Sequence, residues 1–176
     1  LLLKLKYRKN FDVKICGLTQ LPMHILENDF RQEKTYFLLK DADWIKWRLL
    51  DTHDSENHFK MTFKKDFIYF RIVRTNHHAS INLKRLHILY QSSDGDKKSR
   101  LEIIKALINY TITQKIDLIT ATTNIEKLKN VYSHFLLNKL HCRFAYHSDN
   151  SDLMFNIKIN EIPLQSIDSD FDSQYF

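Results

Sequence analysis

Alternating hydrophobic and polar residues predict three consecutive strands in the middle of the chain. Phe59, Met61 and Phe63 alternate with polar residues, and a turn at Lys64-Lys65-Asp66 leads into a second segment at residues 67–74. A period of two places every other side chain on one face of a sheet, so the two segments are typical of a hairpin. A third strand is predicted at residues 81–90, which are rich in branched and aromatic side chains.

Hydrophobic residues spaced three or four apart predict two helices further along, at residues 100–115 and 124–139. Each is preceded by a hydroxyl residue that stands three positions before a glutamate, which is the spacing of a capping box. The two pairs are Ser99 with Glu102 and Thr123 with Glu126. We therefore expect the first helix to begin at Ser99, and Thr123 to cap a second helix that begins at Asn124.

A short apolar segment, IDLITAT at residues 116–122, lies between the two predicted helices. A strand that is followed by a helix and a second strand normally has that second strand as a parallel neighbour in the same sheet. The pattern therefore predicts parallel strands at residues 81–90 and 116–122, which splay apart near Tyr90 and Ala121. We expect the two helices to cover opposite faces of the sheet.

The remaining segments complete a mixed sheet with flanking helices. They are predicted strands at residues 11–17, 142–147 and 152–159 and predicted helices at 21–31 and 41–50, with Trp44 and Trp47 facing the core. Together the elements predict an α+β or α/β fold with a mixed, splayed sheet of about seven strands and about four helices. We expect a leading segment at residues 1–10, a single domain at 11–160 and an acidic tail at 161–176.

The charge of the chain favours an anionic partner. Lys and Arg number 27 against 21 Asp and Glu, which gives a formal net charge of +6. The basic residues are scattered along the chain and form no block. A solvated surface therefore explains them equally well, and a nucleic-acid footprint is not favoured.

Other features of the composition restrict the class of protein. No segment approaches a run of about 18 apolar residues, so no membrane span is expected. Two cysteines, Cys16 and Cys142, cannot form a disulfide framework and indicate a reducing, cytoplasmic compartment. His141, Cys142 and His147 lie close together, but neighbouring residues of a strand face opposite ways, so no metal site is expected.

The loop QSSDGDKK at residues 91–98 is the candidate binding segment. It joins the strand at 81–90 to a helix, and backbone N–H groups in such a loop and at a helix N-terminus can bind a phosphate. The chain has only two glycines, Gly17 and Gly95. A close approach of the backbone to a nucleotide is therefore favoured only near Gly95.

The order of the predicted elements, from about Phe11 to Ile159, resembles that of the GNAT-type N-acetyltransferases: strand, two helices, three strands, helix, strand, helix and two strands. In the loop, Gln91 stands at the first position of the family's motif. Asp94 and Asp96 replace its small residues, and Gly95 is one place out of register. The segment WIKWRLLD at residues 44–51 is also similar to a Trp-Arg helix in acyltransferases of surface-polysaccharide pathways.

The resemblance implies acetyl-CoA as the acyl donor. In this family the strand that matches residues 81–90 holds the pantetheine arm with its backbone, and the following loop and helix N-terminus bind the pyrophosphate. The positions that would contact the cofactor are Leu89, Tyr90, Gln91, Gly95, Lys97, Lys98, Ser99, Arg100 and Asn124.

Two residues are candidates for proton transfer. Tyr132 lies one position from the place where the family often carries a tyrosine that protonates the departing thiolate. It also falls on the hydrophobic stripe of its predicted helix, so a core aromatic is the alternative interpretation. His87 lies on the strand beside the predicted donor site, where a general base could act, and the alternative is a half-buried, hydrogen-bonded histidine.

These observations predict that the chain is a CoA-dependent N-acyltransferase, which transfers an acetyl or other acyl group to an amine such as that of an amino sugar. The retained loop length and the basic residues Lys97, Lys98 and Arg100 favour it. The alternative is a catalytically inactive domain of the same fold that serves as an interaction or assembly module. The scarce glycine and the carboxylates of Asp94 and Asp96 favour that alternative, and a basic nucleic-acid binder is a third hypothesis.

Overall fold

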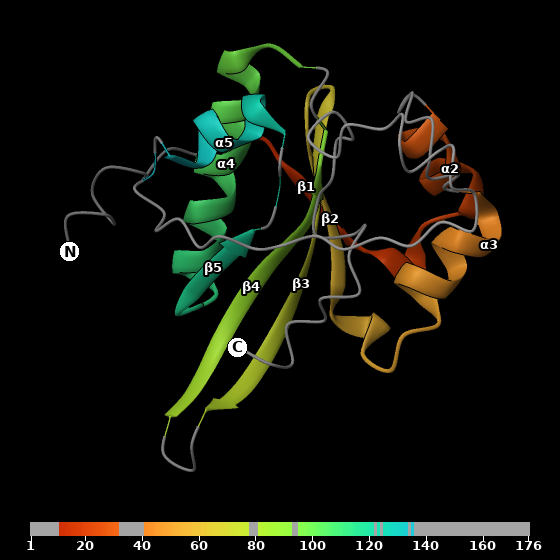
Figure 1. The fold of residues 1–176 in the computed structure, drawn as a ribbon, viewed down its shortest axis with the longest axis horizontal. Coiled ribbons are helices and arrows are strands. Elements are labelled where there is room, and N and C mark those ends of the chain that lie inside the picture. The colour runs from red at the N-terminus through yellow and green to blue at the C-terminus, as the bar shows by residue number, and fades with distance from the viewer. Residues whose placement is uncertain are drawn as a thin grey trace, which may run out of the picture.

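The computed structural model describes residues 11–31, 41–77, 81–92, 95–121, 123, 125–133 and 135. Within these ranges the chain forms one mixed sheet with helices on both faces (Figure 1). The strands are β1 (Lys14–Gly17), β2 (His58–Phe63), β3 (Asp66–His77), β4 (Ile81–Gln91) and β5 (Leu118–Ala121). The helical segments are η1 (Leu18–Gln20), α2 (Met23–Arg31), α3 (Ala42–Ile45), η2 (Lys46–Leu50), η3 (Ser55–Asn57), α4 (Lys97–Thr113) and α5 (Glu126–Ser133).

The five described strands lie in sequence order across the sheet. The first four are antiparallel to one another, and β5 pairs with β4 in the parallel sense. The predicted hairpin and the predicted parallel neighbours are therefore confirmed, as is the mixed character of the sheet. The expected strands at residues 142–147 and 152–159 lie outside the described residues, as do the expected leading segment and tail.

A bulge interrupts β4 close to its end. Tyr90 pairs with Tyr69 of β3, whereas Ile88 pairs with Phe70, so Leu89 is an extra residue in β4. A bulge turns the following side chain to the other face of the sheet. Leu89 and Tyr90 consequently share one hydrophobic cluster with Tyr69.

One face of the sheet, the α4 face, packs against both α4 and α5 (Figure 1). Its buried core contains Met61, Ile68, Phe70, Leu86 and Ile88 of the strands, Ile103, Ile104, Ala106 and Leu107 of α4, and Leu128, Val131 and Tyr132 of α5. The prediction that the two helices cover opposite faces is wrong. Arg85, His87 and Thr120 occupy the opposite face of β4 and β5, because their neighbours in each strand face α4.

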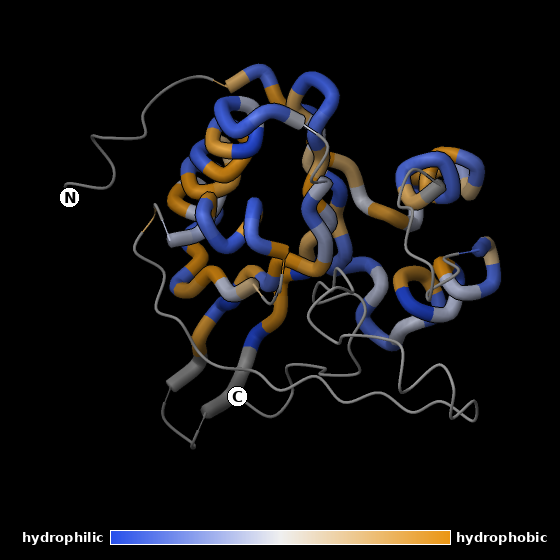
Figure 2. Tube along the Cα trace, turned by 45° about the horizontal axis from the view of Figure 1, so that its top comes forward, coloured by the Kyte–Doolittle hydropathy of each residue, from blue (hydrophilic) through white to orange (hydrophobic). Residues whose placement is uncertain are grey.

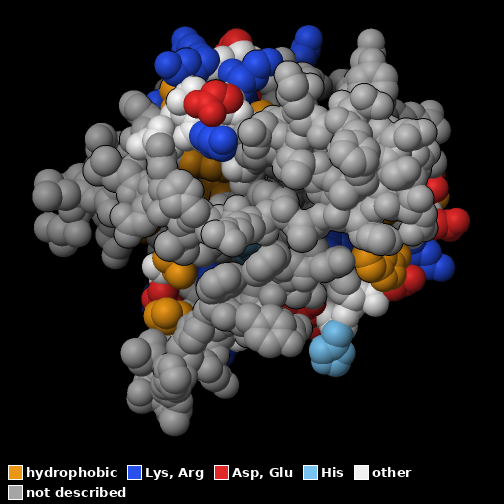
Figure 3. Space-filling model, viewed as in Figure 1, with side chains coloured by type: hydrophobic (Ala, Val, Ile, Leu, Met, Phe, Trp, Pro, Cys, Tyr) orange, Lys and Arg blue, Asp and Glu red, His pale blue; other side chains and the backbone are white. Residues whose placement is uncertain are grey.

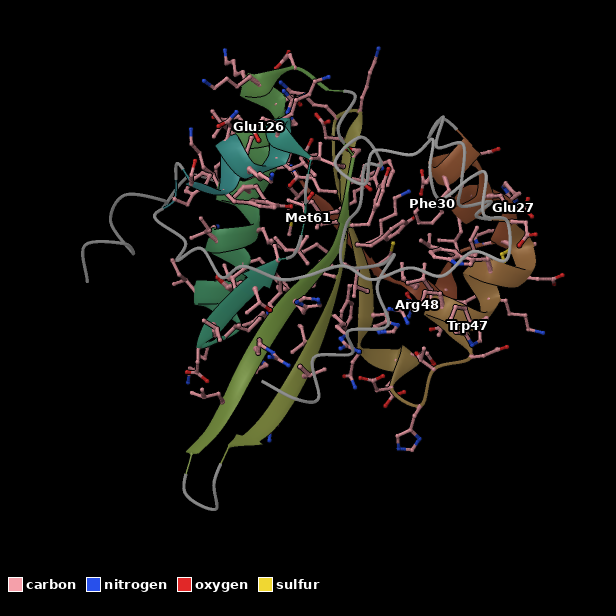
Figure 4. All side chains as sticks on the ribbon, in the orientation of Figure 1. Glu27, Phe30, Trp47, Arg48, Met61 and Glu126 are labelled. Atoms are coloured by element: carbon pink, nitrogen blue, oxygen red, sulfur yellow. The ribbon has the colours of Figure 1, made fainter. Side chains whose placement is uncertain are left out.

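The opposite face, the α2 face, packs against α2, α3 and η2. Phe30 of α2 lies at the centre of this second core, and Figure 4 shows it between α2 and the sheet. Its ring centroid lies 5.1 Å from that of Tyr90, 5.4 Å from that of Tyr69 and 6.0 Å from that of Trp44. Aromatic contacts of this kind add to the stability gained from burial of their area.

Trp47 does not belong to that core. Trp44 packs against it, but 57% of the Trp47 surface is exposed, so the prediction that both tryptophans face inward is wrong. The physical reason is the π-helical η2 segment, whose wider turn moves Trp47 away from the side of Trp44. The Arg48 guanidinium lies 5.7 Å from the centroid of the Trp47 ring, and Figure 4 shows both residues at the edge away from the sheet.

The hydrophobic residues are distributed as two buried layers. Figure 2 shows hydrophobic and hydrophilic residues interspersed along the strands and helices, without a long apolar block. Among the helices that the structure describes, none combines the length and apolar character needed to cross a membrane.

Candidate functional site

Asp96 caps α4. Its carboxylate accepts the backbone N–H of Ser99 at 2.7 Å, and the helix runs from Lys97. The predicted capping box at Ser99 is therefore wrong, and Glu102 forms an ion pair with Lys105 instead, at 2.9 Å. An aspartate at this position both accepts a free helix N–H and places a negative charge at the positive end of the helix dipole.

A second carboxylate, that of Asp66, lies beside the same helix turn. Asp66 begins β3 and is 2% exposed. Its carboxylate accepts the hydroxyls of Ser92, at 3.3 Å, and of Ser99. Ser92 also exchanges hydrogen bonds with the backbone of Phe67, at 3.0 Å in each direction. These contacts fix the first turn of α4 against the start of β3.

Gly95 and Arg100 complete this packing. A Cβ atom added at Gly95 would lie 2.6 Å from Cγ of Asp66 and closer still to its oxygens, so the glycine makes room for Asp66. The buried Arg100 donates a hydrogen bond from its guanidinium to the Gly95 carbonyl. Lys97 and Lys98 are exposed.

The N-terminus of α4 is thus occupied by the protein's own groups. The N–H of Ser99 is bonded to the Asp96 carboxylate and that of Arg100 to the Asp96 carbonyl. A pyrophosphate placed here would meet two carboxylates, each of which would repel it by about 1 kcal/mol or more. The geometry does not favour the pyrophosphate contacts that the resemblance implies for Gly95, Ser99 and Arg100.

Leu89, Tyr90 and Gln91 bury their side chains completely or nearly so. Leu89 and Tyr90 belong to the core of the α2 face, and the Tyr90 ring stacks on that of Phe67 with centroids 5.7 Å apart. These side chains therefore have packing roles. Any contact with a donor at these positions would use the backbone, as the resemblance implies.

His87 lies on β4, two residues before the bulge. Its Nδ1 atom is 2.8 Å from the Thr120 hydroxyl of β5, and the imidazole is almost fully buried. Arg71 of β3 is the partner of His87 in the neighbouring strand, and Arg85 lies two residues before His87 in β4. All three side chains therefore lie on the α2 face of the sheet. Burial and the neighbouring charge of Arg71 lower the pKa of Arg85.

Arg71 and Arg85, the two arginines of this cluster, were not indicated by any motif in the sequence. Both are buried, and both lie at strand positions with the same facing as His87. The period of two therefore could have identified them once the pairing of β3 and β4 was known.

Tyr132 lies in the core of the α4 face, and burial raises its pKa well above the ordinary value. A less acidic phenol is a poorer proton donor, so this placement favours the packing role. Asn124 lies outside the described residues. The Thr123 hydroxyl accepts the N–H of Ile125 at 3.1 Å, and α5 begins at Glu126, two residues after the predicted start at Asn124.

A polar cluster that the sequence pattern did not indicate attaches α2 to the sheet. The Asp29 carboxylate accepts hydrogen bonds from Nζ of Lys60, at 2.5 Å, and from the hydroxyl of Tyr69. The Lys60 ammonium also lies 4.8 Å from the centroid of the Phe67 ring. Burial and the Asp29 charge raise the pKa of Tyr69, which keeps its phenol protonated. We assign this cluster to stability.

Comparisons with protein-family models, curated proteins and solved structures find no match to this chain. Among the residues that the structure describes, no group of three His, Cys, Asp or Glu could hold a metal ion, and His141, Cys142 and His147 lie outside them. The described residues define a mixed α+β domain with a five-stranded sheet in which the β4–β5 pair is parallel.

Proposed function

We propose that the chain is an N-acyltransferase that takes its acyl group from the thioester of a pantetheine arm, the group that acetyl-CoA carries. The observation that supports this most is the end of the β4–β5 pair. Parallel pairing runs from Arg85 with Leu118 to Ile88 with Ala121, whereas β4 continues to Gln91. An amide N–H of the pantetheine arm could donate to the backbone carbonyl of Leu89, the extra residue of the bulge just beyond Ile88, as an extended peptide pairs with a strand.

The bulge at Leu89 lies at the same point of β4. Bulges often redirect backbone groups next to active sites. In the proposed reaction, the nitrogen of the acceptor amine attacks the thioester carbon, and the backbone N–H of Leu89 stabilises the negative charge on the oxygen. The new C–N bond forms, the C–S bond breaks, a base takes the amine proton, and the thiolate leaves and is protonated.

His87 is our candidate for the base. It lies two residues before the bulge, and its hydrogen bond to Thr120 fixes the orientation of the ring across the β4–β5 pair. Transfer of a proton from the acceptor amine to a positioned imidazole typically contributes at least about 10²-fold to the rate.

A second candidate function is an inactive domain that acts as an interaction or assembly module. The carboxylates of Asp66 and Asp96 beside the first turn of α4 favour it, because they oppose the binding of a diphosphate. The two candidates differ in one measurable property, which is acyl transfer from a pantetheine thioester.

The test is transfer of an isotopically labelled acetyl group from acetyl-CoA to a panel of amines and amino sugars, followed by mass spectrometry. We expect an acylated product with the wild type, a loss of about 10²-fold in turnover for His87→Gln, and unchanged turnover for Tyr132→Phe. Tyr132→Phe is the matched control, because it removes one hydroxyl from the buried core while it leaves the ring.

Two results would revise this proposal. Absence of any product from acetyl-CoA and from acetyl-pantetheine would favour the inactive module. An equal loss for Tyr132→Phe, without a change in thermal stability, would return the role of proton donor to Tyr132.

A further inference from the structure

Four lysines meet at the end of the molecule where β4 stops pairing with β5. Lys64 and Lys65 form the turn between β2 and β3, and Lys97 and Lys98 open α4. All four are exposed, and we call them the lysine patch. Figure 3 shows basic side chains gathered at this end, at the top of the view, with acidic ones among them.

The fold fixes the two halves of the patch next to each other. Asp66 directly follows Lys65, and its carboxylate accepts the hydroxyl of Ser99, which directly follows Lys98. The buried Asp66 side chain also holds Ser92, which is bonded to the backbone of β3. Lysines that lie more than thirty residues apart in the sequence are therefore held at one end of the sheet by a buried connection.

The lysine patch lies beside the N-terminus of α4, where two carboxylates disfavour the binding of a diphosphate. The carboxylates of Asp96 and Asp66 accept hydrogen bonds from Ser99 in the first turn of α4, whereas the four lysines are exposed. Lysines at a surface are flexible point charges, so each adds little to the binding of one small ligand. Several of them together attract a large acidic partner and orient its approach.

We propose that the lysine patch docks an acidic acyl carrier protein, whose acylated phosphopantetheine arm reaches the backbone of Leu89 at the bulge of β4. This inference rests on the proposed function. The phosphopantetheine of a carrier protein has a single phosphodiester at the carrier's surface, so no diphosphate has to lie on the first turn of α4. From the end of its pairing with β5 at Ile88, β4 runs on toward the end of the sheet that carries the patch, so an arm from a docked carrier would extend along β4 (Figure 1).

The experiment compares two donors, acetyl-CoA and a purified acyl carrier protein that bears acetyl-phosphopantetheine. Charge-reversed variants are Lys64→Glu/Lys65→Glu and Lys97→Glu/Lys98→Glu, and the matched control is Lys14→Glu/Lys46→Glu, which changes two exposed lysines outside the patch. Circular dichroism establishes that each variant is folded. Fluorescence anisotropy of the labelled carrier protein gives its affinity, and product formation gives kcat/KM for each donor.

We expect kcat/KM for the acetylated carrier protein to exceed that for acetyl-CoA by at least about tenfold. Each patch variant should weaken carrier binding about tenfold, since each replaces two attractive charges by two repulsive ones, and the weakening should diminish at high salt. The control variant should bind as the wild type does, and transfer from acetyl-CoA should be unchanged in the control and in Lys64→Glu/Lys65→Glu.

Transfer from acetyl-CoA that equals or exceeds transfer from the carrier, and that falls in Lys64→Glu/Lys65→Glu, would overturn the inference but retain the proposed function. Equal binding of the carrier with and without its arm, and of a DNA duplex, would overturn it in favour of a general polyanion surface. Transfer from neither donor by folded protein would overturn the proposed function itself.

Discussion

Replacing Asp29 by alanine is expected to lower the free energy of unfolding by about 3–5 kcal/mol. The variant leaves the Lys60 ammonium, whose side chain is 9% exposed, beneath α2 without the carboxylate 2.5 Å away. It also removes the acceptor for the Tyr69 hydroxyl. Denaturant unfolding followed by circular dichroism measures the loss, with the midpoint and slope analysed separately.

The matched control for Asp29→Ala is Glu126→Ala. The pair of Glu126 and Lys129 is exposed on α5, with a separation of 3.6 Å and side chains that are 75% and 46% exposed. Its removal should cost less than about 1 kcal/mol, as for surface ion pairs in general. The double variant Asp29→Leu/Lys60→Met should recover most of the stability, because it removes the buried charge as well. A loss below about 1 kcal/mol for Asp29→Ala would contradict the assigned role of this cluster.

Replacing Gly95 by alanine is expected to destabilise the protein by about 1–3 kcal/mol, the range for overpacked sites. The added Cβ would lie 2.6 Å from Cγ of Asp66, and the buried Asp66 cannot withdraw without breaking its bonds to Ser92 and Ser99. Thermal and denaturant unfolding of the variant measure the effect.

Gly17→Ala provides the comparison, since Gly17 is the only other glycine in the chain. A Cβ there would make an ordinary contact of 3.7 Å with the Gln20 side chain, and the backbone φ of −65° suits alanine, so the change should be neutral or slightly stabilising. A double-mutant cycle of Gly95→Ala with Asp66→Ala should show less than additive losses. Additive losses would mean that Asp66 is not what restricts position 95.

The middle of the sheet could be predicted from the sequence because its signal is local. Phe59, Met61 and Phe63 face the α4 core as their alternation indicates, and the Lys64-Lys65 turn closes the hairpin. The parallel pairing of β4 and β5 follows from the helix between them. Each inference needed only a short window of sequence and one geometric rule.

The wrong predictions concern structural features that depend on residues distant in sequence or on competing residues nearby. Both Asp96 and Ser99 are good caps for α4, and the contact of Ser99 with Asp66, 33 residues away, leaves Asp96 as the cap. The side of the sheet covered by α5 depends on its packing with α4 in one core, which the pattern of the α5 segment alone does not indicate. The exposure of Trp47 depends on a π-helical turn that no simple period indicates.

The same difference between local signals and contacts of distant segments applies to the candidate site. The strand and loop that carry it were predicted, but the pairing of Asp29 with Lys60 and the neighbouring positions of Arg71, Arg85 and His87 arise only when separate segments meet. Gly95 was identified as a special position from the scarcity of glycine, but only the structure shows that it makes room for the buried carboxylate of Asp66.

The most direct test of the central claim is a nuclear magnetic resonance titration of ¹⁵N-labelled protein with pantetheine, the part common to both donors. We predict that the amide signals of residues 89–91, and of β5 near Ala121, shift on binding, because the arm should lie along β4 where its pairing with β5 ends. The signals of Tyr132 and of the α4 core should move little. Shifts confined to other regions, or none at millimolar pantetheine, would contradict the account.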